Sequence, residues 1–118
     1  MTLVEVRPER VVADVEYRRD LTMPWGMLHG GVTVGLADTC AGIAATANLA
    51  PGMRFLTVEL KVNFLRPVTA GRIRASCTPI SIGRTVMVFQ VQVEDEAGKP
   101  TAFLTATQLV LPAERFEP

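Results

Sequence analysis

Histidine and cysteine are scarce in this chain of 118 residues, which holds one histidine and two cysteines. Two cysteines cannot build a disulfide framework, and no spacing of cysteine and histidine matches a zinc site. Cys40 lies in an apolar run and Cys77 in a run of strand-like alternation, so we expect both to be buried free thiols. These features predict a protein of the reducing cytoplasm that holds no metal ion.

Net charge is also absent, because twelve basic residues balance twelve acidic ones. That balance argues against a nucleic-acid partner and against a polybasic membrane anchor. The N-terminal segment lacks the long apolar core of a signal peptide. Residues 30–50 approach the length of a membrane span, but they are rich in small residues and carry Asp38 near their middle. They therefore fit a buried helix of a soluble protein, and no membrane partner is expected.

Repeats, low-complexity tracts and linkers are missing as well, so residues 1–118 are expected to form one domain. Proline is absent from residues 31–49, which end at Ala-Pro-Gly and form the one convincing helix. Alternating segments predict strands at residues 10–17, 57–65, 72–80, 85–94 and 101–111. The predicted order is β-α-β-β-β-β. It corresponds to an α+β fold in which a curved, five-stranded antiparallel sheet wraps around one long helix.

The strand predicted at residues 57–65 alternates between apolar and polar side chains. Val58, Leu60, Val62 and Phe64 fall on one face of this strand. Thr57 falls on the opposite face, together with charged and amide side chains. The pattern therefore places Thr57 away from the apolar face.

Asp38 is the only residue between Leu21 and Met53 that carries a charge at neutral pH. Steps of three, four and seven residues along the helix place it on a face of mostly small residues. That face comprises Gly31, Val34, Gly35, Ala41, Gly42 and Ala45. Bulkier residues, such as Leu36, occupy the other sides and suit the sheet. The small face would let a second backbone or a flat ligand approach the carboxylate closely.

Gly30 and Gly31 open the predicted helix, where unpaired N–H groups and the positive dipole end form a donor site for a carbonyl or an oxyanion. Glycine lets a substrate approach such a backbone closely. Hydrolysis by acyl transfer needs both an oxyanion donor and a carboxylate such as Asp38. Eight residues separate Gly30 from Asp38, however, which is about 12 Å along one helix. If both take part, a two-fold dimer with antiparallel helices would bring Asp38 of one chain to the Gly30 N–H of the other.

Structural roles for the same residues remain open at this point. Asp38 also fits a carboxylate that bonds a backbone or hydroxyl group, and His29 fits an N-terminal cap or a packing residue.

The stretches GMLHGGVTVGLAD, FLTVELKVNFLRPVTAG and SIGRTV resemble the hotdog-fold acyl-CoA thioesterases of the phenylacetate-pathway (PaaI-like) type. The 4-hydroxybenzoyl-CoA thioesterases are relatives of that group. The resemblance extends over residues 11–111 and implies a hotdog fold. It also implies a homodimer with active sites at its interface, and dimers that pair again into tetramers. The implied partner is an acyl-CoA substrate, of which coenzyme A is a part, so no cofactor is expected.

The resemblance assigns roles to four residues by their positions. Asp38 would act as the general base on water or as the nucleophile. The Gly30 N–H would polarise the thioester carbonyl, and His29 would help to shape that loop. Thr57 would position the attacking water.

Further positions match the substrate-binding part of the family pattern. Arg66, Gly83 and Arg84 match positions near bound coenzyme A, and Gly31 adjoins the carbonyl site. For the two arginines, a solvated surface role is the alternative. Met23 stands where family members often carry an asparagine that helps to bind the carbonyl or place the water. Methionine is only a weak acceptor and cannot donate.

The leading hypothesis is hydrolysis of an acyl-CoA thioester to a free acid and coenzyme A. The alternative is a non-catalytic module that binds acyl-CoA or fatty acid, and Met23 is the main argument for it. A hydratase or dehydratase on the same fold fits less well, because the histidine–carboxylate motif of that chemistry has no counterpart after His29.

Overall fold

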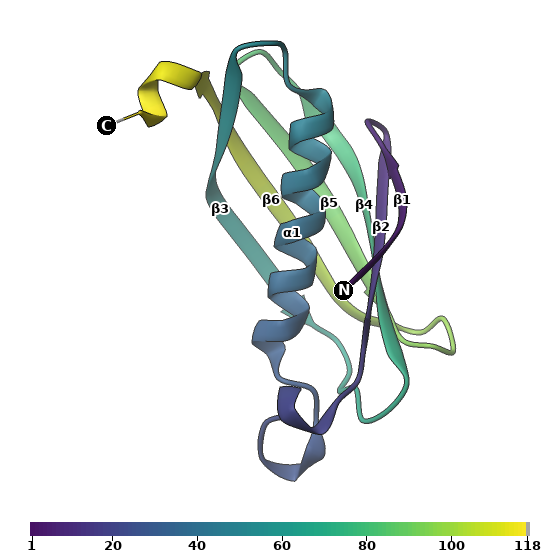
Figure 1. Cartoon of the computed structure of the whole chain (residues 1–118). Helices are drawn as coiled ribbons and strands as arrows, with labels where there is room; N and C mark the ends of the chain where they lie inside the picture. The colour runs from purple at the N-terminus through teal and green to yellow at the C-terminus, as the bar shows by residue number, and fades with distance from the viewer. Residues whose placement is uncertain (118) are drawn as a thin grey trace.

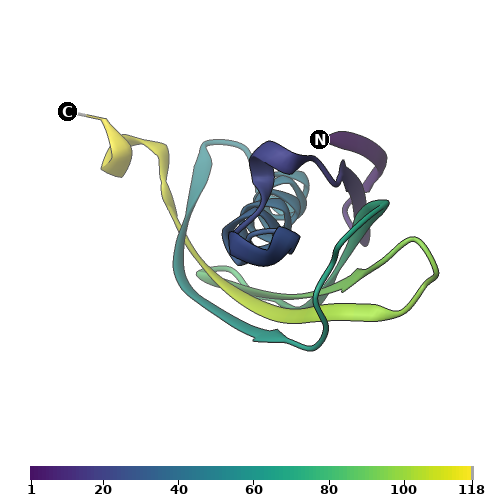
Figure 2. The same ribbon diagram turned by 90° about the horizontal axis from the view of Figure 1, so that it is seen from below.

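The computed structural model describes residues 1–117 and has the predicted arrangement of one long helix and an antiparallel sheet (Figure 1). The main elements are β1 (Thr2–Arg7), β2 (Arg10–Glu16), α1 (Gly30–Asn48), β3 (Met53–Phe64), β4 (Arg72–Ile82), β5 (Val86–Glu94) and β6 (Pro100–Pro112). Short 3-10 turns occupy Arg19–Leu21, Pro24–Gly26 and Ala113–Phe116. The strand order is β1-β2-β4-β5-β6-β3, with every neighbouring pair antiparallel. Seen along the helix, the sheet curves around α1, which confirms the predicted fold class (Figure 2).

The sheet has six strands, so the prediction of five was one short. The strand that was missed is β1, which pairs with β2 at the edge of the sheet. Leu3, Val4 and Val6 are each about half exposed, so neither face of β1 is buried. The apolar–polar alternation by which the other strands were found is set by burial of one face. It is therefore absent from this edge strand.

The core lies between one side of α1 and the inner face of the sheet. Burial raises the pKa of the Cys40 thiol to about 11 and that of the Cys77 thiol to about 12. Both are fully buried and free, as predicted.

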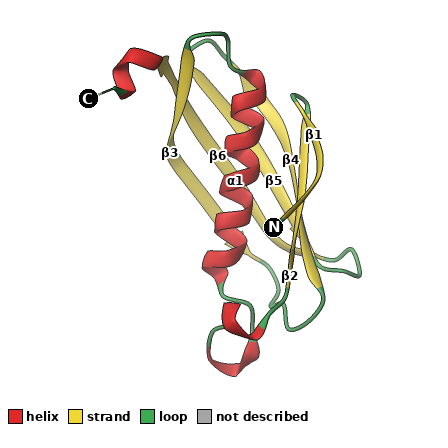
Figure 3. Ribbon diagram, in the orientation of Figure 1, coloured by secondary structure: helices red, strands yellow, loops and turns green. Residues whose placement is uncertain are grey.

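The predicted small-residue face of α1 was wrong in part, because Ala41 and Ala45 are fully buried. The exposed positions of α1 are instead Gly31, Gly35, Thr39, Thr46 and Ala47. Figure 3 shows that one side of the helix is not covered by any strand.

The predicted faces of β3 were wrong at its centre. The register with β6 shifts between Thr57 and Glu59, so Val58 forms a β-bulge. A bulge inserts one residue and reverses the alternation on either side of it. Val58 is therefore 55% exposed. Thr57 turns inward instead, onto the face that carries the half-buried Leu60 and Val62.

Strand β2 is fixed to β4 by an ion pair as well as by its backbone. Asp14 accepts hydrogen bonds from Arg74 Nε at 2.8 Å and from Arg74 Nη2 at 2.9 Å. These bonds hold the pKa of the Asp14 carboxyl below its usual range.

Within residues 1–117, no helix is both long and apolar enough to cross a membrane.

Candidate active site

Asp38 lines a groove of about 620 Å³ between the open side of α1 and the inner face of β3. The groove is lined by Val6, Asp38, Thr39, Gly42, Ile43, Thr46, Ala47, Phe55 and Thr57. Asp38 Oδ1 lies 3.5 Å from Thr57 Oγ1, at the outer limit of a hydrogen bond. Among residues 1–117, no ion pair includes Asp38. The structure therefore places a lone carboxylate and a hydroxyl side by side in an otherwise mostly apolar groove.

The hydroxyl of Thr57 is held from behind by Gln108 of β6. Thr57 Oγ1 donates to Gln108 Oε1 at 2.7 Å, which is shorter than the contact with Asp38. Gln108 is fully buried and lies directly across the β3–β6 ladder from Thr57. Gln108 is not among the site residues that the sequence predicts. The sequence does carry a signal for it: Gln108 continues the alternation of Ala102, Leu104 and Ala106, which form the buried face of β6.

The N-terminus of α1 is capped by the side chain of His29. The Gly31 N–H donates to His29 Nδ1 at 2.8 Å, and the Val32 N–H donates to the His29 carbonyl at 3.0 Å. The capping role that was left open for His29 is therefore present. Among residues 1–117, the Gly30 N–H donates to no acceptor. The cap thus leaves one N–H of the first turn available.

Replacing His29 by alanine is expected to lower the free energy of unfolding by about 1 kcal/mol, because the cap at Gly31 is lost. His29→Asn should retain most of the stability, since asparagine is a good N-cap. Chemical denaturation of the three proteins measures the difference. Equal losses in the alanine and asparagine variants would contradict a capping role.

A second cavity, of about 440 Å³, adjoins this helix N-terminus. It brings together three residues predicted from the sequence: Met23, Gly30 and Arg66. Other lining residues were not predicted, among them Phe64, Leu65, Val68 and Thr101. Met23 contributes no hydrogen-bond donor to this cavity from its side chain. At the helix end, the cavity is lined by Gly30, whose N–H has no acceptor within the described part of the chain, and by Thr33.

The Phe64 ring packs closely against Gly30. A Cβ atom at Gly30 would lie only 2.9 Å from Cζ of the Phe64 ring, closer than carbon atoms approach. Gly31 is similarly restricted, because a Cβ there would lie 3.0 Å from His29 Nδ1. The two glycines therefore allow the aromatic wall and the histidine cap to close on the helix N-terminus.

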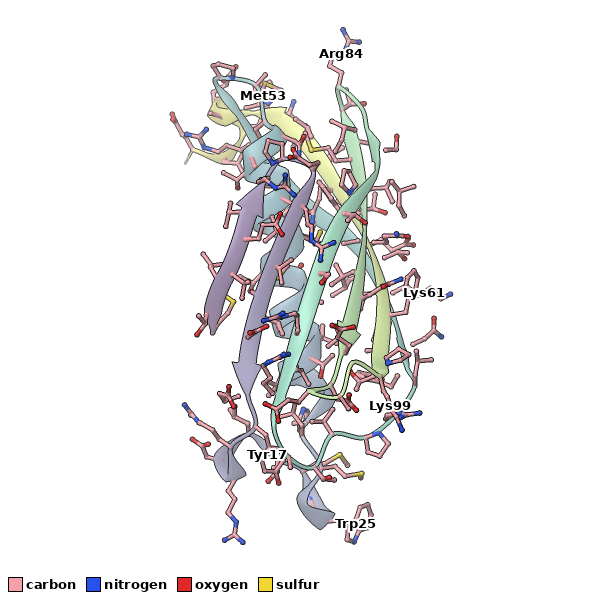
Figure 4. The ribbon with its side chains drawn as sticks, turned by 90° about the vertical axis from the view of Figure 1, so that its right-hand side faces the viewer. Tyr17, Trp25, Met53, Lys61, Arg84 and Lys99 are labelled. Carbon is pink, nitrogen blue, oxygen red and sulfur yellow. The ribbon has the colours of Figure 1, made fainter. Side chains whose placement is uncertain are left out.

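Within one chain, the structure does not unite all the predicted site residues. Asp38 and Gly30 line different cavities, and Thr57 lies with Asp38. Arg84 lies at the opposite end of the molecule from Trp25, which neighbours Met23 in the loop before α1 (Figure 4). A Cβ at Gly83 would lie 2.7 Å from the Val86 carbonyl oxygen, so the tight β4–β5 turn itself requires this glycine.

Side chains that ligate metals are dispersed in this structure. Across residues 1–117, no three His, Cys, Asp or Glu side chains are grouped so that they could hold a metal ion.

Known proteins match this chain in sequence and in fold. The family model described as the thioesterase superfamily matches residues 26–102. A 1,4-dihydroxy-2-naphthoyl-CoA hydrolase of Listeria monocytogenes is 32% identical over 97 residues, covering 82% of this chain and 79% of the relative. A proofreading thioesterase of Klebsiella pneumoniae is 34% identical over 76 residues, covering 64% of this chain and 56% of the relative. The chain thus spans about half the length of several curated relatives that it matches.

The fold comparison agrees with the sequence comparison. The crystal structure of a thioesterase from Haemophilus influenzae superposes with a TM-score of 0.89 at 30% identity. The superposition covers 94% of this chain and 78% of that one.

Proposed function

This chain belongs to the thioesterase superfamily, and from that premise we propose that it hydrolyses an acyl-CoA thioester to a free acid and coenzyme A. The observation that carries the proposal is the pairing of Asp38 with Thr57 in the open groove. A carboxylate without a cationic partner is free to accept a proton from water. The name of the Listeria relative, a CoA thioester hydrolase, supports the choice of substrate class.

The proposed reaction uses Asp38 to activate the attack and the Gly30 N–H to stabilise it. In the general-base form, a water oxygen bonds to the thioester carbon while one water proton passes to Asp38. The carbonyl oxygen takes up the negative charge and accepts from the Gly30 N–H. The C–S bond then breaks, and the proton held by Asp38 neutralises the departing thiolate. In the nucleophilic form, an Asp38 oxygen bonds to the carbon while the C–S bond breaks and coenzyme A departs as the thiolate. Water then cleaves the resulting anhydride, which releases the acid, restores the Asp38 carboxylate and supplies the proton that neutralises the thiolate.

The proposed reaction requires two copies of the chain, because Asp38 and Gly30 are about 12 Å apart along α1. For two antiparallel helices related by a two-fold axis, residue 38 meets residue 30 of the partner subunit when the axis passes near Val34 and Gly35. Gly35 is exposed, and a Cβ there would meet no atom within 4 Å of its own chain. The absence of a side chain at Gly35 supports a helix of a second copy as its neighbour.

The free edge of β3 supports the same arrangement. β3 is the last strand of the sheet, and its apolar Leu56, Val58 and Phe64 are each about half exposed. Pairing β3 with β3 of a second copy would cover these side chains and join the two sheets. The active sites would then lie at the dimer interface, and association of two such dimers would give the tetramer.

The arginines that we propose to bind coenzyme A are assigned by charge alone. The phosphates of coenzyme A suit Arg66, which is exposed at the mouth of the cavity beside Gly30. Arg84 lies at the end of the molecule opposite to Trp25 (Figure 4), so Arg84 and the adjacent Gly83 would approach the same ligand only from another subunit.

A thiol-release assay on a panel of aryl, short and long acyl-CoAs tests the proposed function. We expect release of free coenzyme A from at least one member, and none above background with Asp38→Ala.

Met23 favours a second function, because it supplies no donor to the site. That function is the non-catalytic binding of acyl-CoA or fatty acid. If calorimetry shows tight binding of an acyl-CoA and the assay shows no thiol release, the binding function is supported and the hydrolase proposal fails.

A further inference from the structure

Gln108 places a primary amide in the core, where packing alone does not require a polar side chain. Its side chain is fully buried on β6, between neighbours that are apolar. Its Nε2 is a buried donor without an acceptor among the described residues. An unpaired buried donor costs stability, and an apolar residue of the same length would avoid that cost. The one contact that accounts for the amide is the 2.7 Å hydrogen bond that Gln108 Oε1 accepts from Thr57.

That bond decides which way the Thr57 hydroxyl can act. A threonine hydroxyl has one hydrogen and two lone pairs. Because the hydrogen is committed to Gln108, the 3.5 Å contact with Asp38 cannot use it. Thr57 then offers only lone pairs to the groove, beside a carboxylate that is also an acceptor. A water molecule that donates to both would keep its own lone pair free to attack.

We propose that Gln108 is a positioning residue for the reaction of this groove: it fixes the Thr57 hydroxyl as an acceptor for the attacking water. The inference rests on the proposed hydrolase function. Gln108 acts through Thr57 and does not touch the substrate, since its side chain has no exposed surface. Its effect therefore falls on turnover and leaves substrate binding unchanged.

Gln108→Met tests the proposal, because it keeps the length of the side chain and removes the acceptor. We expect kcat for acyl-CoA hydrolysis to fall about tenfold, the loss of one oriented hydrogen bond, with KM unchanged. The melting temperature should stay level or rise, since the unpaired donor is removed. Gln108→Glu should recover part of kcat, because a buried carboxyl is protonated and still offers a carbonyl oxygen to Thr57.

Gln90 provides a matched control on the neighbouring strand. Its amide also bonds a threonine across the sheet, since Gln90 Nε2 donates to Thr78 Oγ1 at 3.4 Å. Gln90 does not line the groove of Asp38. Gln90→Met should leave both kcat and KM unchanged.

A double-mutant cycle separates positioning from packing. In a Thr57→Val background, Gln108→Met should have no further effect on kcat, because the hydroxyl that Gln108 orients is gone. Two results would overturn the role of Gln108 and leave the hydrolase proposal intact. One is a double variant whose loss of kcat equals the product of the two single losses. The other is a Gln108→Met protein with the same kcat as an active wild-type enzyme. If the wild-type protein hydrolyses no acyl-CoA, the proposed function fails and this inference fails with it.

Discussion

Asp38→Asn is expected to lower kcat for acyl-CoA hydrolysis by about a hundred- to ten-thousandfold, the usual contribution of a general base. Asparagine keeps the shape of the side chain and can still contact Thr57, 3.5 Å away, but it cannot accept a proton from water. KM should change little, because the groove keeps its shape. Thiol release at saturating acyl-CoA measures the loss, and a thermal melt shows whether the variant is folded.

Asp14→Asn is the matched control for this prediction. Asp14 is also a carboxylate on the sheet, but it is bound by Arg74 and lines neither the groove of Asp38 nor the cavity beside Gly30. Asparagine keeps one acceptor oxygen but removes the charge that pairs with Arg74, so the melting temperature should fall while kcat stays near the wild-type value. An Asp38→Asn protein that retained full turnover would remove Asp38 from the mechanism.

Gly30→Pro is expected to lower kcat by about a hundred- to a thousandfold, as does the loss of one oxyanion donor in other enzymes. Proline has no N–H and suits the first position of a helix. Gly30 occupies that position, and His29 before it has an extended backbone with φ −64° and ψ 133°, which a following proline tolerates. Steady-state thiol release again provides the measurement.

Gly30→Ala separates the missing N–H from the added carbon atoms. Alanine also introduces a Cβ that pushes against the Phe64 ring, but it keeps the N–H. We therefore expect the alanine variant to be much more active than the proline variant. Equal losses would assign the defect to Phe64 and not to the N–H.

Mixing the two inactive proteins tests whether one site uses both subunits. When Asp38→Asn and Gly30→Pro chains are co-expressed, half of randomly formed dimers are hybrids with one intact site, so about a quarter of the wild-type activity should return. Each variant expressed alone sets the background. A mixture that stays inactive would place both groups of a site in the same chain.

Much of the fold follows from local patterns of residues. Alternation of apolar and polar residues located five of the six strands, and Ile73, Ala75, Cys77, Phe89 and Val91 are buried as their spacing predicted. The helix was predicted at residues 31–49 and is observed at Gly30–Asn48. Its start is defined by His-Gly-Gly and its end by Ala-Pro-Gly, and both signals act over a few residues. The strand β1 escaped this logic because it buries neither face.

The candidate site was predictable only where a residue type was unusual in its place. Asp38 is the lone charge of a long uncharged stretch, and the glycines beside His29 mark a helix start with a free N–H. By contrast, Gln108 is one polar residue among several on its strand. Its importance depends on which face of β6 is buried and on the residue opposite it across the ladder.

The sequence by itself determined one long apolar helix, an antiparallel sheet around it, and a carboxylate on that helix, because each depends on the period of side chains along the chain. Only the tertiary structure decided that Thr57 turns toward Asp38. That orientation depends on the bulge at Val58, which arises from the pairing of β3 with β6. A bulge is a property of two strands in register, and a one-residue shift reverses every side chain beyond it. Thr57 therefore meets both Asp38 and Gln108 only once α1 packs against β3 and β3 pairs with β6, which lies far along the chain.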